Sequence, residues 1–344
     1  MNYEQLVNHL KNHQYKWGVT GVAGFIGSHI LEELLNLGQK VIGIDNFSTG
    51  TQKNLDYVLD SIDDHHKENF TFIRGDLQDQ DLCGQICEYA EFILHQGALG
   101  SVPRSLNSPR NSHNSNVNGQ FNLLVASQDS KIKSFVYASS SSVYGDNQNC
   151  PKKEDCTGKP LSPYAATKKI NEIYGQVFSD CYKLNIRGLR YFNVFGPRQN
   201  PNGPYAAVIP IWIRSLIRNE EVYIFGDGST SRDFCYVKNA VQANLLAAFN
   251  TQNNIGHEIY NIACGRETSL NDLFSIIKTE LSQFIPDIKN RGPLYKDFRE
   301  GDIKNTLASI NKGKKDFNYD SPFSINEGLK ETINWFYNHQ ETYT

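Results

Sequence analysis

The sequence lacks the features that mark several classes of protein. Its seven cysteines are odd in number and dispersed, which suits a reducing compartment better than a disulfide framework. The net charge of −3 gives no basic field for nucleic acid and no polybasic membrane patch. No apolar run approaches the length of a membrane span, and residues 1–16 lack the apolar stretch of a signal peptide. We therefore expect a cytoplasmic protein without nucleic-acid or membrane partners.

Metal-ligand spacing is also missing. Cys83 and Cys87 could form half of a metal site, but no second pair follows at ligand spacing, so buried thiols are the simpler interpretation. His65 and His66 lie in a polar stretch that we expect to be a solvated loop. The sequence therefore predicts no bound metal.

The pattern of apolar residues indicates an α/β protein. The 344 residues, 39% of them hydrophobic, can form either two lobes or one large domain. Expected strands at 17–21, 40–45, 70–73, 90–94 and 134–138 alternate with helical stretches such as 28–37, which is typical of parallel βαβ units. Beyond Tyr191, short apolar pieces such as 222–225 are separated by turn residues. We predict a Rossmann-type doubly wound parallel sheet over residues 1–190 and a smaller, interleaved substrate lobe over 191–344.

A glycine-rich loop predicts a dinucleotide site. Gly21, Gly24 and Gly27 lie between the first strand and a helix, where backbone N–H groups can approach a pyrophosphate. Their GxxGxxG spacing departs from GxGxxG. Asp45 ends the second strand, where a carboxylate accepts hydrogen bonds from the adenosine ribose and repels a 2′-phosphate. Since Asn46 supplies no compensating arginine, NAD is favoured over NADP.

Three residues predict what is done with the cofactor. Tyr164 and Lys168 are four apart after Pro163, a residue that suits a helix start, so their side chains share one helical face. We expect the ammonium of Lys168 to lower the tyrosine pKa from about 10 toward neutrality. The phenol could then remove a proton from a sugar hydroxyl while hydride leaves the same carbon. Ser140 would hydrogen-bond the oxygen that becomes a carbonyl.

These residues belong to a series of motifs that resembles the extended short-chain dehydrogenase/reductase family, specifically its nucleotide-sugar 4-epimerases. The resemblance covers about 17–335 and rests on ordered motifs: TGVAGFIGS at 20–28, DNFSTG at 45–50, HQGALGSVPRS at 95–105, SSSSVYGD at 139–146, SPYAATK at 162–168, RYFNVFGPRQ at 190–199, AAVIP at 206–210, GDGSTSRDFCYV at 226–237 and FREGD at 298–302. Within the family, three of them look like those of bacterial epimerases acting on UDP-N-acetylhexosamines: HQGALGSVPRS, the serine run and PYAAVIP.

The resemblance implies two sets of site residues. The NAD site would comprise Gly21, Gly24, Phe25, Ile26, Gly27, Asp45, Asn46, Ser48, Gly50, Asp76, Leu77, Gln96, Ala98, Ser115, Tyr164, Lys168, Tyr191 and Val194. The UDP-sugar site would comprise Gly100, Ser101, Arg104, Ser140, Ser141, Ser142, Tyr164, Asn193, Ala207, Val208, Tyr223, Arg232, Arg299, Asp302 and Thr306. Independently of the family, arginine forks such as Arg232 and Arg299 suit a pyrophosphate. Asp76 could equally be an ordinary turn aspartate.

One position bears on the sugar. The family's hexose-only epimerases have a bulky tyrosine four residues after the segment equivalent to FREGD, whereas this chain has Thr306, which leaves room for a C2 N-acetyl group. Dehydratases of the family carry an acidic residue beside the catalytic serine or threonine, and here only serines stand there. We therefore expect a 4-epimerase that interconverts UDP-GlcNAc and UDP-GalNAc, as a homodimer. Two alternatives stay open: epimerisation of the corresponding UDP-uronic acids, and an inactive NAD-binding regulator on the same fold.

Overall fold

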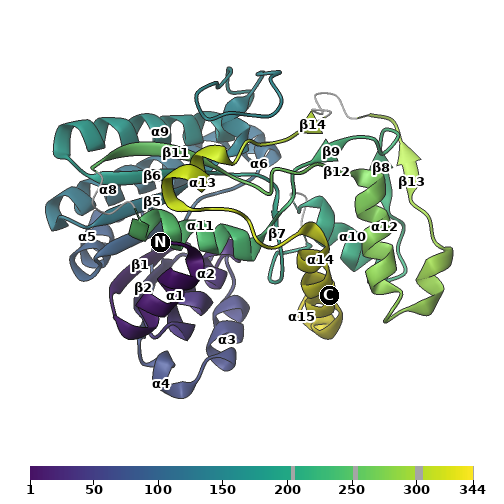
Figure 1. The fold of residues 1–344 in the computed structure, drawn as a ribbon, viewed down its shortest axis with the longest axis horizontal. Helices are drawn as coiled ribbons and strands as arrows, with labels where there is room; N and C mark the ends of the chain where they lie inside the picture. Colours follow the sequence, from purple (N-terminus) through teal and green to yellow (C-terminus); the bar gives the residue numbers. More distant parts are fainter. Residues whose placement is uncertain (203–205, 251–254, 299–304, 344) are drawn as a thin grey trace.

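A seven-stranded sheet organises the larger part of the molecule (Figure 1). The structure is a computed structural model that describes all residues except 203–205, 251–254, 299–304 and 344. The strands are β1 (Lys16–Thr20), β2 (Lys40–Asp45), β3 (Phe70–Arg74), β4 (Phe92–His95), β5 (Ser134–Ser140), β6 (Asn185–Tyr191) and β11 (Gly256–Ile262). Their order is β11-β6-β5-β4-β1-β2-β3, and every neighbouring pair is parallel. The predicted doubly wound Rossmann-type sheet is confirmed.

The order of the strands determines where a ligand can bind. Strands β2 and β3 lie on one side of β1 in the sheet, and β4, β5 and β6 lie on its other side. The connections after β1 and β4 therefore leave the sheet in opposite directions and open a crevice at the carboxyl ends of these strands.

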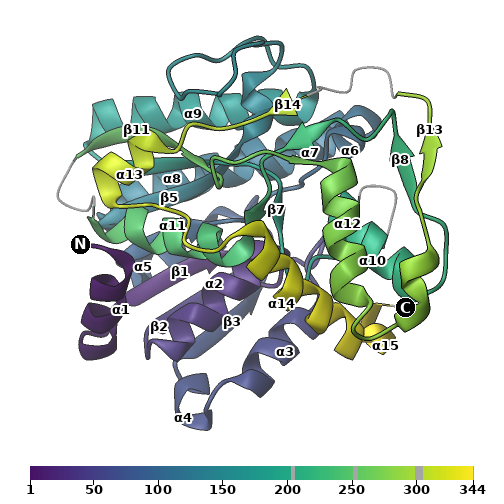
Figure 2. The ribbon, with the colours of Figure 1, turned by 45° about the vertical axis from the view of Figure 1, so that its right-hand side comes forward.

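Helices cover both faces of the sheet (Figures 1 and 2). One layer contains α2 (Phe25–Asn36) and α11 (Val237–Asn250), with α1 (Tyr3–Asn12) and α3 (Gln52–Ser61) packed beside them. The opposite layer contains α5 (Gln80–Tyr89), α8 (Gly119–Ser130) and α9 (Pro163–Tyr182). Because both faces are covered, the central strands are apolar almost throughout, as in β4, where all four residues are buried.

A smaller lobe has its own core. Helices α10 (Val208–Ile217), α12 (Leu270–Leu281) and α14 (Ile325–Asn338) pack around Trp212, Leu273 and Ile333. Beside them lie two small sheets, one of β8 (Tyr223–Phe225) and β13 (Leu294–Lys296), the other of β9 (Ser231–Arg232), β12 (Thr268–Ser269) and β14 (Asn305–Thr306). The predicted interleaving is confirmed, since β11 lies in the C-terminal part of the sequence but completes the large sheet beside β6.

Short elements make the remaining connections. They are α4 (Asp64–Lys67), α6 (Val102–Asn107), α7 (Pro109–His113), η1 (Asn114–Asn118), η2 (Ser141–Tyr144), β7 (Val194–Phe195), β10 (Cys235–Tyr236), η3 (Pro286–Asn290), α13 (Asn311–Phe317) and α15 (Gln340–Tyr343). Across the described ranges, no helix combines the length and apolarity that crossing a bilayer requires. All seven cysteines are free thiols.

Candidate active site

A cavity of about 560 Å³ opens in the crevice between the carboxyl ends of the strands. Of the eighteen residues predicted for the cofactor, all but Gly50 line it: Gly21, Gly24, Phe25, Ile26, Gly27, Asp45, Asn46, Ser48, Asp76, Leu77, Gln96, Ala98, Ser115, Tyr164, Lys168, Tyr191 and Val194. From the substrate set it is lined by Gly100, Ser101, Ser140, Ser141, Ser142, Tyr164 and Asn193. The lining also includes residues that sequence reasoning missed, among them Thr49, Gly75, Gly97 and Ala138.

The glycine loop is shaped for close approach. Gly21 has a left-handed φ of 65°, and a Cβ on Gly27 would lie 2.0 Å from the Gly21 carbonyl oxygen. The helix α2 begins at Phe25, three residues earlier than expected, so its first turn lines the cavity. The N-cap Gly24 makes no side-chain capping bond. The positive end of the helix dipole is therefore presented to the cavity, as an anion such as a pyrophosphate requires.

Asp45 is held at the end of β2 by backbone donors. The residue is 8% exposed, and its carboxylate accepts hydrogen bonds from Ala23 N at 2.9 Å and Phe47 N at 2.8 Å. Burial raises the pKa of this carboxyl, and the backbone N–H groups oppose the rise. Gly50 packs closely against the backbone of the glycine loop, because a Cβ on Gly50 would lie 2.7 Å from the Ala23 carbonyl carbon.

Asp76 lines the cavity from a turn after β3. It accepts hydrogen bonds from Asn46 Nδ2 at 2.7 Å and from Gln78 N at 2.9 Å. Burial alone would raise the pKa of this carboxyl, but these bonds outweigh it and the pKa is lowered. The residue is thus a turn aspartate that also faces the cavity.

The predicted catalytic residues are brought together at the ends of β5 and α9. Pro163 begins α9 as predicted, and the Ser162 side chain caps it by accepting from Ala165 N at 3.1 Å. Lys168 is 2% exposed, and its Nζ donates to the Ala138 carbonyl at 2.8 Å. Burial lowers the pKa of this lysine to about 8. Its Nζ lies 5.9 Å from the centroid of the Tyr164 ring.

The predicted lowering of the Tyr164 pKa by Lys168 is wrong for this structure. Burial of the phenol raises its pKa above the ordinary value, and the opposing influence is a hydrogen bond with Ser140. The reason is that removing a phenol from water disfavours its anion, while the ammonium is bonded to Ala138 instead. Ser140 Oγ also accepts from Ser142 Oγ at 2.9 Å and Ser142 N at 3.2 Å, so the serine run forms a connected group.

A buried ion pair lies one helical turn beyond Lys168. Glu172 accepts from Arg190 Nε at 2.8 Å and Arg190 Nη2 at 2.9 Å, and both side chains are nearly inaccessible. Glu172 also accepts from Ser139 Oγ at 2.7 Å. The pair therefore ties α9 to β6 and to the residue that precedes Ser140. Sequence reasoning missed Glu172, although its i+4 spacing from Lys168 was a usable signal.

Several predicted substrate residues lie outside the cavity. Arg104, Ala207, Val208, Tyr223, Arg232 and Thr306 do not line it, and Arg299 and Asp302 lie outside the described residues. Arg232 in β9 pairs in parallel register with Thr306 in β14. Thr306 Oγ1 is buried and has no hydrogen-bond partner within the described ranges. Tyr223 donates to Glu221, and Lys296 Nζ stands 3.5 Å from the centroid of its ring.

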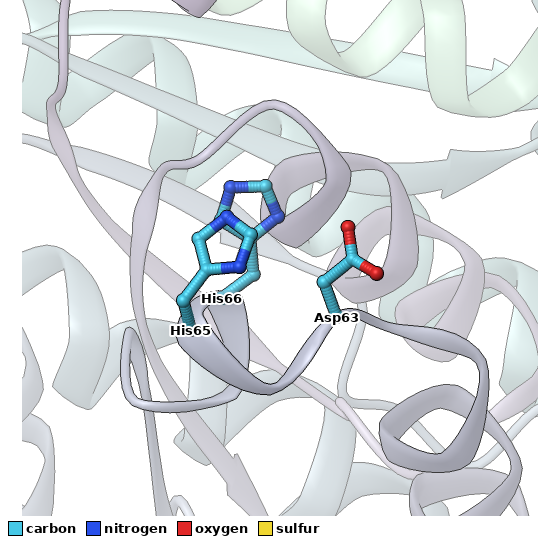
Figure 3. A group of neighbouring side chains, drawn as sticks. All are labelled: Asp63, His65 and His66. Atoms are coloured by element: carbon cyan, nitrogen blue, oxygen red, sulfur yellow. The ribbon is translucent and has the colours of Figure 1, made fainter.

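In the described part of the chain, one group of potential metal-ligating side chains lies close together (Figure 3). It consists of Asp63, His65 and His66, whose ligand atoms lie within 4.8 Å of one another. The predicted loop is the short helix α4, and the three side chains are exposed or half-buried. None of them lines the cavity, so they take no part in the site.

Comparison with known proteins assigns the family. Residues 17–263 match the NAD dependent epimerase/dehydratase family. The chain belongs to this family. A putative UDP-glucose 4-epimerase of Methanocaldococcus jannaschii is 36% identical over 94% of this chain and 99% of its own length. Among solved structures, the UDP-N-acetylglucosamine 4-epimerase of Methanobrevibacter ruminantium M1, in complex with UDP-N-acetylmuramic acid, shares 40% identity with a TM-score of 0.84, covering 94% of this chain and 99% of that one. The UDP-glucuronic acid 4-epimerase of Bacillus cereus, in complex with UDP-glucuronic acid and NAD, shares 29% identity with a TM-score of 0.80 over the same shares.

NAD is the cofactor of this epimerase-family chain, and the cavity fits it. A Cβ at Gly21 would lie 2.7 Å from Gly97 N and one at Gly27 would lie 2.0 Å from the Gly21 carbonyl oxygen, so the loop can take this shape only with glycine at both positions. The first turn of α2 supplies backbone donors for a pyrophosphate. The buried carboxylate of Asp45 stands where a ribose diol would be bound. The cofactor site is therefore formed both by the backbone of the loop and α2 and by the Asp45 side chain.

Proposed function

We propose that this chain is an NAD-dependent UDP-sugar 4-epimerase whose substrates are UDP-GlcNAc and UDP-GalNAc. The observation that carries the choice of sugar is the small side chain of Thr306, in register with Arg232 of the substrate lobe. The 40% identity to a UDP-N-acetylglucosamine 4-epimerase supports it. Relatives named for glucose and glucuronate support only the coarser activity.

Proton transfer is the part of the reaction that the chain itself performs. The cavity that the Gly21–Gly27 loop and Asp45 line would hold NAD, whose nicotinamide would supply the hydride acceptor and donor for C4 of the sugar. Tyr164 takes the O4 proton as that carbon is oxidised and returns it when the 4-keto sugar, having turned about its link to UDP, is reduced on its other face. Ser140 hydrogen-bonds both Tyr164 and the developing carbonyl. Lys168, whose pKa burial lowers to about 8, is mostly protonated at neutral pH, and its Nζ is held by the Ala138 carbonyl on the strand that carries Ser140.

The substrate lobe would hold the nucleotide. We propose that Arg232 and Arg299 bind the pyrophosphate, and that Asn193, Ala207, Val208, Tyr223 and Asp302 contact the rest of UDP. Asn193 supports this role, because it lines the cavity and donates from Nδ2 to the Asp233 carbonyl at 3.1 Å, next to Arg232. Gly100, Ser101 and Arg104, at the start of α6, would meet the sugar together with Ser141 and Ser142.

Three substrates and one variant test the proposal. The wild-type protein is incubated separately with UDP-Glc, UDP-GlcNAc and UDP-GlcNAcA, and C4 configuration is followed by proton NMR. We expect turnover of UDP-GlcNAc to be fastest. Preferred turnover of UDP-GlcNAcA would establish the uronic acid alternative instead. No turnover, with no NADH appearing on sugar addition, would establish the inactive regulator.

The substitution Thr306→Tyr tests the steric argument. A ring added opposite C2 must displace the acetamido group or press into packed protein, and overpacking costs about 1–3 kcal/mol, roughly a 5- to 150-fold loss in rate. UDP-Glc carries only a hydroxyl at C2, so we expect the added ring not to slow its turnover. The quantity that decides is the ratio of kcat/KM for the two sugars, with Thr306→Ser as the matched control. An unchanged ratio would remove Thr306 from substrate selection.

We also propose that two copies associate through α8 and α9. These neighbouring helices expose apolar side chains at i and i+4: Phe121 and Val125, each 38% exposed, and Ile173 and Val177, 54% and 46% exposed. A second copy would bury this surface. Sedimentation should give a dimer that Ile173→Glu dissociates and Ile255→Glu, another exposed apolar site, does not. A monomeric wild type would contradict the proposal.

A further inference from the structure

Three side chains from distant parts of the chain form a closed ring of hydrogen bonds under the cavity. Asn244 Nδ2 donates to the Tyr191 hydroxyl at 2.7 Å, which donates to Gln96 Oε1 at 3.0 Å. Gln96 Nε2 closes the ring by donating to Asn244 Oδ1 at 2.9 Å. Tyr191 and Gln96 line the cavity, whereas Asn244 does not.

Asn244 reaches this ring from the far side of the sheet. It lies on α11, in the opposite helix layer from the catalytic α9 (Figures 1 and 2). Its side chain is fully buried, and its Nδ2 also donates to the Ala240 carbonyl one turn earlier. That second bond fixes which end of the amide is the donor, and thereby the direction of every bond in the ring.

The ring holds each of the two cavity residues, Gln96 and Tyr191, in a single side-chain orientation. The Tyr191 hydroxyl both accepts and donates within it, and the Gln96 amide is held at both its oxygen and its nitrogen. Without Asn244, the Gln96 amide would lose its acceptor and the Tyr191 phenol its donor. Both side chains would then have to be ordered when a ligand binds, which weakens binding.

We propose that Asn244 is a positioning residue for the cofactor: it holds Gln96 and Tyr191 in the orientation that receives NAD. It never touches the cofactor itself. Its contribution is that two side chains of the cavity floor are already ordered before binding. The inference rests on NAD as the cofactor and is independent of which sugar is turned over.

The test compares two buried asparagines of the same helix. Asn244→Leu removes the ring donor and acceptor and keeps the branched arrangement of side-chain heavy atoms. Asn239→Leu is the matched control, because Asn239 is also fully buried but bonds to the Phe323 backbone, away from the cavity. NAD dissociation constants are measured by calorimetry on stripped protein without sugar, and thermal stability is measured in parallel.

We expect both variants to lose stability, but only Asn244→Leu to bind NAD about tenfold more weakly, or about 1.4 kcal/mol. Tyr191→Phe should weaken NAD similarly, and the double variant no further, because the two changes break the same ring. Equal NAD affinity in the two asparagine variants, or additive losses in the double variant, would overturn the proposal. If Asn244→Leu fails to fold, Asn244→Ala, which also removes the ring donor and acceptor, takes its place in the same cycle with Tyr191→Phe and is decided by the same criterion.

Discussion

Adding a single methyl group at Gly27 should disable the cofactor loop. In Gly27→Ala the new Cβ would lie 2.0 Å from the Gly21 carbonyl oxygen, 2.8 Å from the Gly21 carbonyl carbon and 3.0 Å from Val22 Cα. All three are backbone atoms, so no side chain can rotate away. Since the first of these contacts is more than about 1 Å too short, the loop and the first turn of α2 must separate.

The size of the effect follows from what has to move. Forced overpacking costs about 1–3 kcal/mol of stability, and a displacement of about 1 Å at a binding site can cost about 100-fold in function. We therefore expect Gly27→Ala to lose NAD affinity by about two orders of magnitude while its melting temperature falls by a few degrees. Calorimetric titration of stripped protein with NAD, together with thermal unfolding, measures both quantities.

Gly84 provides the matched control. It lies in α5, and a Cβ there would meet no atom within 4 Å. Gly84→Ala should stabilise the protein by about 0.5–1 kcal/mol and leave NAD affinity unchanged. A Gly27→Ala protein that binds NAD within a few-fold of wild type would refute the argument that this contact shapes the loop.

Three further predictions follow from the same site. Tyr164→Phe should fold and retain NAD while kcat falls on the order of 10²–10⁴-fold; a variant with most of the wild-type kcat would remove Tyr164 from the mechanism. Asp45→Ala should weaken NAD retention, and Asn46→Arg should shift preference toward NADP, both measured as dissociation constants; wild type that copurifies with NADP would contradict this. Glu172→Gln should destabilise by about 3–5 kcal/mol in chemical denaturation, because it leaves the Arg190 charge buried. Burial alone would raise the pKa of Glu172, but its interactions with Arg190 outweigh burial and the pKa is lowered. The stability that the ion pair contributes is therefore fully present above the unfolded-state pKa of about 4.3 and is lost as the pH falls through the lower folded-state pKa. A stability difference between wild type and Glu172→Gln that stays constant across this pH window would contradict the prediction.

Most features that could be predicted from the sequence depend on the spacing of residues that are close together in it. The alternation of apolar strands and helices predicted the parallel sheet, because side-chain periodicity depends only on near neighbours. The Gly21–Gly27 loop and the Tyr164–Lys168 pair could be recognised for the same reason, because each lies within one short stretch of the sequence. The helix start at Phe25 was missed because backbone geometry at a glycine loop has no periodic signal.

The tertiary structure decided which residues act together and in what electrical environment. Asn244 of α11 bonds Tyr191 of β6, and Arg190 of β6 bonds Glu172 of α9, so no spacing rule within one element could connect the two members of either pair. The rise in the Tyr164 pKa was likewise invisible, since spacing predicts the neighbouring ammonium but not how completely both groups leave water. Proximity along a helix is encoded locally, whereas desolvation and contacts across the sheet exist only once the layers have packed.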